Sequence, residues 1–161
     1  MATTITATVL QGPFSHSASS SNPILSWYAK YAADFAHNKG TTPPTNYYAS
    51  TATLVHTDNS TISGAQQIWD YYISLYGQFE KCSYELISAI VLNDDQSGKH
   101  TLLVQVKNLL HLEGDRGTVT VPQAFTYEIA KAEDGSGTDG LQIWQIRCYF
   151  DRGFLQKAAS V

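Results

Sequence analysis

The chain has 161 residues and a formal net charge of −4, with 10 Lys and Arg against 14 Asp and Glu. This length predicts one domain with a substantial core. The basic residues are scattered rather than gathered into a stripe that could follow phosphates. No apolar run is long enough to span a bilayer, so we expect neither nucleic-acid nor membrane partners.

Residues 1–22 are expected to form an N-terminal arm. Residues 3–10 are rich in Thr and β-branched side chains, which predicts an edge strand or arm, and the Ser-rich stretch 15–21 predicts a loop. The N-terminus lacks the basic region and continuous apolar core of a signal peptide. Cys82 and Cys148 are the only cysteines, and two free thiols fit a reducing compartment. We therefore expect a cytoplasmic protein.

A first helix is predicted from Pro23 to about His37. Asn22 is a good N-cap, and Pro23 stands at the first helical position, where its missing N–H is not needed. Aromatic and apolar side chains recur at helical spacing and give the helix one aromatic face: Ile24, Trp27, Tyr28, Tyr31 and Phe35.

The middle of the chain predicts a strand and a second helix. Residues 41–46 contain Pro43-Pro44 and cannot form an ordinary helix interior. A strand is expected over 48–56, a turn at 58–60, and an amphipathic helix over about 65–76 after Gly64.

The rest of the chain predicts antiparallel sheet. Four strands separated by turn residues are expected over 82–92, 101–112, 118–132 and 141–150. Strands of this length with short connections predict a strongly curved sheet. Helices followed by a meander define an α+β fold, and we expect residues 23–161 to form a single domain.

Two segments carry a recognisable pattern. In residues 47–72 a strand ends in a polar group, a loop closes on Gly64 and an amphipathic helix follows, and residues 141–151 form a last strand that delivers a carboxylate. This pattern resembles the NTF2-like superfamily, and within it the SnoaL-like and ketosteroid-isomerase-like proteins. The resemblance implies a cone: a curved, mostly antiparallel sheet packed on N-terminal helices around one pocket for a small apolar organic ligand. Relatives of this shape commonly pair through their sheets, so we expect a homodimer.

Three residues are candidates for catalysis. His56 follows the run Ala52–Val55 at the position where ketosteroid isomerases carry their general base, and an imidazole can exchange a proton at neutral pH. Asp151 ends the last strand, where the resemblance implies an acid or base. Tyr31 lies in a segment similar to the one that supplies the oxyanion tyrosine. The alternatives are a hydrogen-bonded strand-end histidine, a surface carboxylate and a core aromatic.

Other residues are candidates for contacts with the substrate. Tyrosine combines an apolar ring with a hydroxyl and suits a pocket wall. Gln123 falls where the isomerases keep a protonated Asp, and it could donate a hydrogen bond but could not act as an acid. His111 shares a strand face with Lys107, which favours a solvent-facing position. The full set of candidate substrate-binding residues is Trp27, Tyr48, Tyr72, His111, Gln123, Phe125, Arg147 and Tyr149.

No motif for a cofactor or metal is present in the sequence. There is no phosphate-binding loop, no dinucleotide fingerprint, no nucleophile elbow and no metal-ligand spacing. A cofactor-independent reaction or pure binding is therefore what remains. The resemblance implies an isomerase, cyclase or dehydratase that acts by acid–base chemistry on a polyketide- or terpenoid-like molecule, in the manner of tailoring enzymes of secondary metabolism. The alternatives are a non-catalytic module that binds a ligand or protein, and an assembly protein.

Overall fold

The computed structural model describes residues 4–12 and 21–160, which form one seven-stranded sheet with helices. The strands are β1 (Ile5–Gln11), β2 (Tyr48–Val55), β3 (Thr61–Ser63), β4 (Lys81–Asp94), β5 (Lys99–His111), β6 (Thr118–Lys131) and β7 (Leu141–Tyr149). The helices are α2 (Pro23–Asn38), α3 (Ala65–Tyr76) and α4 (Arg152–Ala159), with single 3₁₀ turns η1 (Pro44–Asn46) and η2 (Glu113–Asp115).

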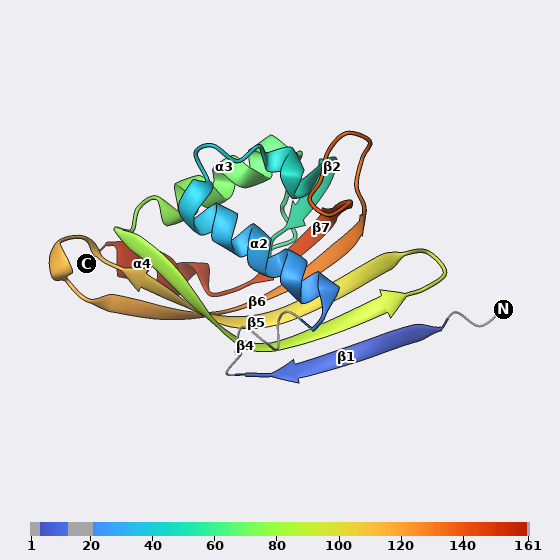
Figure 1. The fold of residues 1–161 in the computed structure, drawn as a ribbon. Helices are drawn as coiled ribbons and strands as arrows, with labels where there is room; N and C mark the ends of the chain where they lie inside the picture. Colours follow the sequence, from blue (N-terminus) through green and yellow to red (C-terminus); the bar gives the residue numbers. More distant parts are fainter. Residues whose placement is uncertain (1–3, 13–20, 161) are drawn as a thin grey trace.

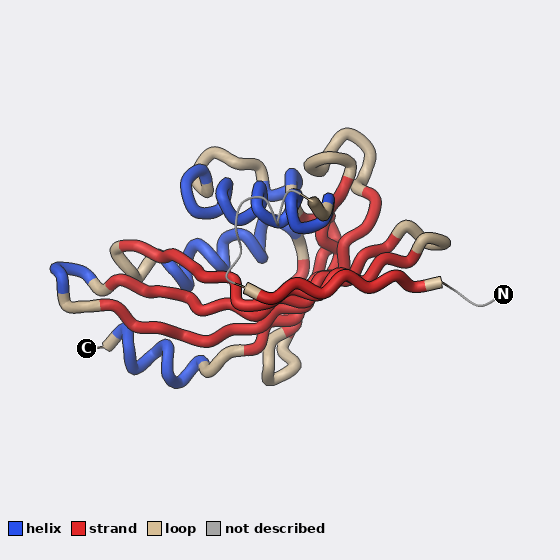
Figure 2. The backbone as a smooth tube through the Cα atoms, turned by 60° about the horizontal axis from the view of Figure 1, so that its bottom comes forward, coloured by secondary structure: helices blue, strands red, loops and turns tan. Residues whose placement is uncertain are grey.

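The sheet is curved and unclosed, with the strand order β1-β4-β5-β6-β7-β2-β3 (Figure 1). Neighbouring strands are antiparallel except for β2 and β7, which pair in parallel. Helices α2 and α3 lie together over the concave side of the sheet (Figure 1), whereas α4 lies beside β6 past the end of β7 (Figure 2). This is the α+β cone that the sequence predicted, with a curved and mostly antiparallel sheet packed on helices.

The two helices over the sheet begin where the sequence places their caps. The Asn22 side chain accepts hydrogen bonds from the backbone N–H groups of Ile24 and Leu25, at 3.0 and 3.3 Å. Gly64 precedes α3 with φ of +102°, a conformation that L side chains rarely adopt. The atoms nearest to a Cβ at this position belong to the movable end of the Gln67 side chain, so the backbone conformation is what favours glycine here. The predicted helix starts are therefore confirmed.

The long strands alternate between a buried concave face and an outer face. On β5 the concave face carries Val104, Val106 and Leu110, all buried, whereas Gln105 and Lys107 are exposed. On β7 the buried side chains are those of Gln142, Ile143, Ile146 and Cys148. The core therefore lies between the concave face and the aromatic sides of α2 and α3.

Four features differ from the sequence expectation or extend it. The expected N-terminal strand is part of the main sheet, because β1 pairs with β4 along its whole length. The short strand β3 and the C-terminal helix α4 were not predicted. A single 3₁₀ turn, η1, occupies the proline-containing segment. The expected Ser-rich loop lies outside the described residues except for Ser21.

Candidate functional site

A cavity of about 310 Å³ lies between the two N-terminal helices and the concave face of the sheet. Its size is at the lower end of the range of about 300–1,000 Å³ that is usual for ligand sites, so the expected apolar cavity is present. Its wall comes from α2, α3, the turn before β4, and strands β4, β5 and β6. It is lined by Tyr28, Tyr31, Ala32, Phe35, Ala36, His37, Lys39, Tyr72, Tyr76, Phe79, Glu80, Lys81, Cys82, Ser83, Tyr84, Val106, Asn108, Gln123, Phe125 and Tyr127.

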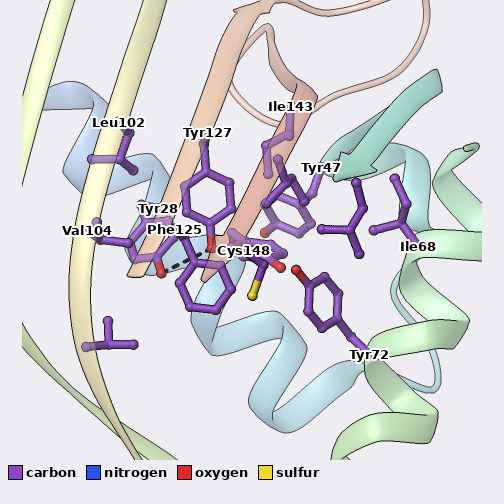
Figure 3. Close-up of a cluster of buried hydrophobic side chains, with 14 of the residues drawn as sticks. Tyr28, Tyr47, Ile68, Tyr72, Leu102, Val104, Phe125, Tyr127, Ile143 and Cys148 are labelled. Carbon is purple, nitrogen blue, oxygen red and sulfur yellow. Dashed lines mark hydrogen bonds between the residues drawn. The ribbon is translucent and has the colours of Figure 1, made fainter. Parts of the chain in front are cut away.

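Simple sequence periodicities bring the aromatic rings of this wall together. Tyr28, Tyr31 and Phe35 follow one another by three and four residues and so share one face of α2. Phe125 and Tyr127 are two residues apart on β6 and both point from the strand into the space under the helices (Figure 3). The wall is therefore a continuous aromatic surface to which helices and sheet both contribute.

Two pairs of tyrosine hydroxyls are hydrogen-bonded at the wall. The hydroxyl of Tyr31 bonds that of Tyr48, and the hydroxyl of Tyr28 bonds that of Tyr127 at 3.5 Å. Burial raises the pKa of all four phenols above the ordinary value of tyrosine. These groups therefore stay neutral near pH 7 and can donate hydrogen bonds.

Tyr72 differs from its neighbours because its hydroxyl has no hydrogen-bond partner among the described residues. The side chain is only 4% exposed, and the hydroxyl oxygen is fully buried. Figure 3 shows this hydroxyl pointing from α3 toward the sheet, on the side of Cys148. A buried polar group without a partner costs about 1–3 kcal/mol, and the Tyr72 hydroxyl is such a group within the described residues.

Three buried polar side chains form a separate network at the cavity wall. The Oε1 atom of Gln123 accepts from the Nδ2 of Asn108 at 3.3 Å and lies 3.4 Å from the Tyr76 hydroxyl. The Nε2 of Gln123 lies 3.3 Å from the same hydroxyl. Asn108 uses its amide N–H₂ in this network and keeps its side-chain carbonyl oxygen as an acceptor, so the wall can bind a neutral polar group of a ligand.

Four of the residues expected to bind or act on a substrate line this cavity: Tyr31, Tyr72, Gln123 and Phe125. Trp27 and Tyr48 are buried behind the wall rather than in it. The indole N–H of Trp27 donates to the backbone oxygen of Thr138 at 2.8 Å, and Tyr48 supports Tyr31 through its hydroxyl.

His56 and Asp151 lie outside the cavity lining, so they do not converge there with Tyr31. The ring of His56 packs edge-on against Tyr71, with centroids 5.0 Å apart, and burial lowers the pKa of His56 below its ordinary value. Asp151 is exposed and caps α4, where its Oδ1 accepts from the N–H of Phe154 at 3.0 Å. Catalytic roles for His56 and Asp151 stay predictions.

The remaining expected residues lie on the outer face of the sheet. Arg147 and Tyr149 are exposed on β7, and their neighbours Ile146 and Cys148 face the core. His111 is half-buried near the end of β5, where its Nδ1 lies 3.0 Å from the Thr118 hydroxyl. None of the three lines the cavity.

Sequence reasoning missed part of the wall. Tyr28 and Phe35 were recognised as one helix face with Tyr31, and that spacing could have placed them at the site. Tyr127 shares a strand face with Phe125, which gives a similar signal. Asn108 carried no such signal, because only the pairing of β5 with β6 brings it near Gln123.

The described residues 4–12 and 21–160 contain no group of three or more His, Cys, Asp or Glu side chains that could hold a metal ion. In the same residues no helix combines the length and the apolar character needed to cross a membrane.

Solved structures share this fold at low sequence identity. No family model and no curated protein matches the chain. The Kfla4162 protein from Kribbella flavida superposes with a TM-score of 0.65 at 13% identity, over 89% of this chain and 99% of that one. An NTF2-like protein of unknown function in nutrient uptake from Rhodospirillum rubrum gives 0.60 at 14%, over 81% and 99%.

A third structure has a fold that is described as ketosteroid-isomerase-like. A hypothetical protein with a ketosteroid-isomerase-like fold from Catenulispora acidiphila, in complex with trimethylamine, gives a TM-score of 0.55 at 16% identity, over 83% of this chain and 92% of that one. The fold of this chain is therefore NTF2-like, as the sequence resemblance predicted.

Proposed function

We propose that this protein binds a small, largely apolar, oxygen-bearing molecule in the aromatic cavity and acts on it by cofactor-independent acid–base chemistry. The reaction would be an isomerisation, cyclisation or dehydration of a polyketide- or terpenoid-like compound. The observation that carries the proposal is the cavity wall itself, in which buried phenols and amides stand among aromatic rings. As the sequence indicates, the protein would act in the cytoplasm as a tailoring enzyme of secondary metabolism.

The chemistry would depend on neutral hydrogen-bond donors. Proton removal next to a carbonyl gives an oxyanion, which donors in a water-poor site stabilise strongly. Tyr31 and Tyr72 are the candidates, because both line the cavity and burial keeps their phenols protonated by raising the pKa of each. His37 and Glu80, which also belong to the lining, are candidates for carrying the proton.

A second candidate function is non-catalytic ligand binding. One observation favours it: the two lining residues that bear an imidazole or a carboxylate, His37 and Glu80, are both exposed. Side chains in such positions lie at the cavity mouth rather than against the buried wall. A carrier would need only the aromatic wall and its neutral donors.

A neutral aromatic ketone, 1-tetralone, separates the two functions. Binding is followed by tryptophan fluorescence and thermal shift, and proton removal by exchange of the C2 protons in D₂O, measured by NMR. Ala32→Phe places a ring in the cavity, and Ala33→Phe on the exposed side of the same helix is the matched control. We expect binding and faster exchange than in buffer, and both should be lost in Ala32→Phe only.

The outcomes are distinct. Binding of 1-tetralone without accelerated proton exchange would show that the protein is a ligand carrier and would exclude the proposed enzyme function. Equal binding by Ala32→Phe and the parent protein would exclude the cavity as the site, and with it both functions.

A further inference from the structure

The cavity changes character at its mouth, where charged side chains gather. Lys39, Glu80 and Lys81 are the charged lining residues, and His37 stands beside them. Lys39 is half-buried and the other three are exposed. The buried wall is aromatic and amide in character, so a ligand that fills the cavity meets net positive charge only at its outer end.

Lys39 is held at this position by the fold. The chain leaves α2 at Lys39, and the indole N–H of Trp69 donates to the Lys39 backbone oxygen at 3.0 Å. The ammonium group lies 6.0 Å from the centroid of the Phe35 ring. Its charge also acts on the Cys82 thiol, opposing the rise in pKa that burial causes there. Phe35 and Cys82 both line the cavity, so the ammonium stands at its entrance.

Neither mouth lysine is paired with a carboxylate of the described residues. The ion pairs between described residues join Lys30 to Asp139, Lys107 to Glu85, and Arg152 to Asp58. No described carboxylate oxygen lies within 4.0 Å of the Lys39 or Lys81 ammonium, although Glu80 belongs to the same rim. Two cations against one anion favour a negatively charged group at this place.

We infer that the ligand is an aromatic or polycyclic carboxylic acid, held with its rings in the cavity and its carboxylate at Lys39 and Lys81. This inference rests on the proposed function, because it specifies the molecule that the same cavity takes. A carboxylate deep in the cavity would lose its hydration without meeting a cation, so the acid group must point outward. A neutral oxygen elsewhere on the ligand would then be available for hydrogen bonds with Asn108 and Gln123, which belong to the cavity lining.

A matched pair of probes tests the charge preference directly. 2-Naphthoate and 2-naphthamide have the same rings and nearly the same shape, and they differ in charge. We expect the intact protein to bind 2-naphthoate about tenfold more tightly than 2-naphthamide, since each exposed ion pair is worth about two- to fivefold. The preference should shrink as salt is raised.

Variants of the charged lining residues show which side chains cause the preference for 2-naphthoate. Lys39→Met with Lys81→Met should bring the two affinities within about twofold of each other, by weakening the acid alone. Glu80→Gln should strengthen binding of the acid. Lys30→Met, on α2 but absent from the cavity lining, is the control and should change neither affinity.

The failure of this inference differs from the failure of the proposed function. If 2-naphthamide binds as tightly as 2-naphthoate in the intact protein, the inference is overturned while the cavity remains a ligand site. The inference is also overturned if the double lysine variant keeps the full preference. If 2-naphthoate, 2-naphthamide and 1-tetralone all fail to bind, the proposed function falls as well.

Discussion

Tyr72 and Tyr76 stack almost parallel on α3, with ring centroids 6.2 Å apart and 5° between their planes, yet within the described residues only Tyr76 has a hydrogen-bond partner. The two residues have the same chemistry, lie one helical turn apart and both line the cavity. They therefore form an internal comparison between a satisfied and an unsatisfied buried phenol.

Replacing each of these tyrosines by phenylalanine should have different consequences. Tyr72→Phe removes a hydroxyl that is buried without a partner, so the free energy of unfolding should stay within about 0.5 kcal/mol of the parent value or rise. Tyr76→Phe breaks the contact with Gln123 and should cost about 1 kcal/mol. Urea unfolding measures both. A clear loss in Tyr72→Phe would mean that its hydroxyl has a partner.

Gln123→Leu should destabilise the protein. The change removes the acceptor of Asn108 and the partner of the Tyr76 hydroxyl, and it leaves both groups buried. We expect a loss of about 1–3 kcal/mol in the free energy of unfolding. The control is Gln105→Leu at an exposed position on β5, which should change stability by less than about 0.5 kcal/mol. Equal effects would show that the buried network adds nothing.

His56 should make stability depend on pH on the acid side. Burial lowers the pKa of His56 and the charge of Arg152 lowers it further, whereas Asp58 raises it. The unfolded chain therefore binds the proton more readily than the folded protein. The contribution of neutral His56 is complete above its ordinary pKa of about 6.5, and it is lost as the pH falls through the lower folded-state pKa.

Thermal unfolding between about pH 7 and pH 5 measures this effect. We expect Tm to fall toward pH 5 and His56→Gln to flatten the fall. Burial also lowers the pKa of His100, so the double replacement with His100→Gln should give a flatter profile than either alone. An unchanged slope in His56→Gln would contradict the assignment.

The positions of His56 and Asp151 also predict their effect on chemistry. A positioned acid or base contributes about 10²–10⁴-fold to turnover. Because both residues lie outside the cavity lining, we expect His56→Gln and Asp151→Asn to leave the exchange of 1-tetralone protons within about twofold of the parent rate. A hundredfold loss in either variant would restore the catalytic role that the sequence indicated. Asp151→Asn keeps an N-cap side chain, which protects α4.

The outer face of the sheet predicts self-association. Trp144 and Tyr149 on β7 are 37% and 47% exposed, and exposed large aromatic side chains are typical of interaction surfaces. We expect a two-fold symmetric dimer in light scattering at micromolar concentration. Trp144→Ser with Tyr149→Ser should weaken the dimer, whereas Tyr84→Ser at the cavity should not. A monomeric parent protein would contradict this prediction.

Local sequence patterns predicted most of the helices and strands. They failed where the face or the role of a residue depended on packing against the rest of the molecule. The helix expected over about 65–76 is α3, because Gly64 and the apolar spacing fix it locally. On β7, alternation correctly grouped Arg147 with Tyr149, but only packing decides that this face is the outer one. Asp151 looked like a free carboxylate at a strand end because α4, which it caps, was not predicted.

The parallel pairing of β2 with β7 determines when the cavity can form. The Gln142 side chain on β7 donates to the Tyr48 backbone oxygen on β2, which lies 94 positions earlier in the chain. Apart from β7, the only strand beside β2 in the described part of the chain is the three-residue β3. Until the last strand is in place, β2 and the helix that follows it have no sheet to join.

Closing so long a loop is entropically costly and slows folding, typically to milliseconds or longer. On the ribosome, α2 and α3 would emerge long before β7, the last strand of the sheet that they cover. Their aromatic faces would stay uncovered during that interval, which makes the nascent chain a natural client for chaperones that shield apolar surface.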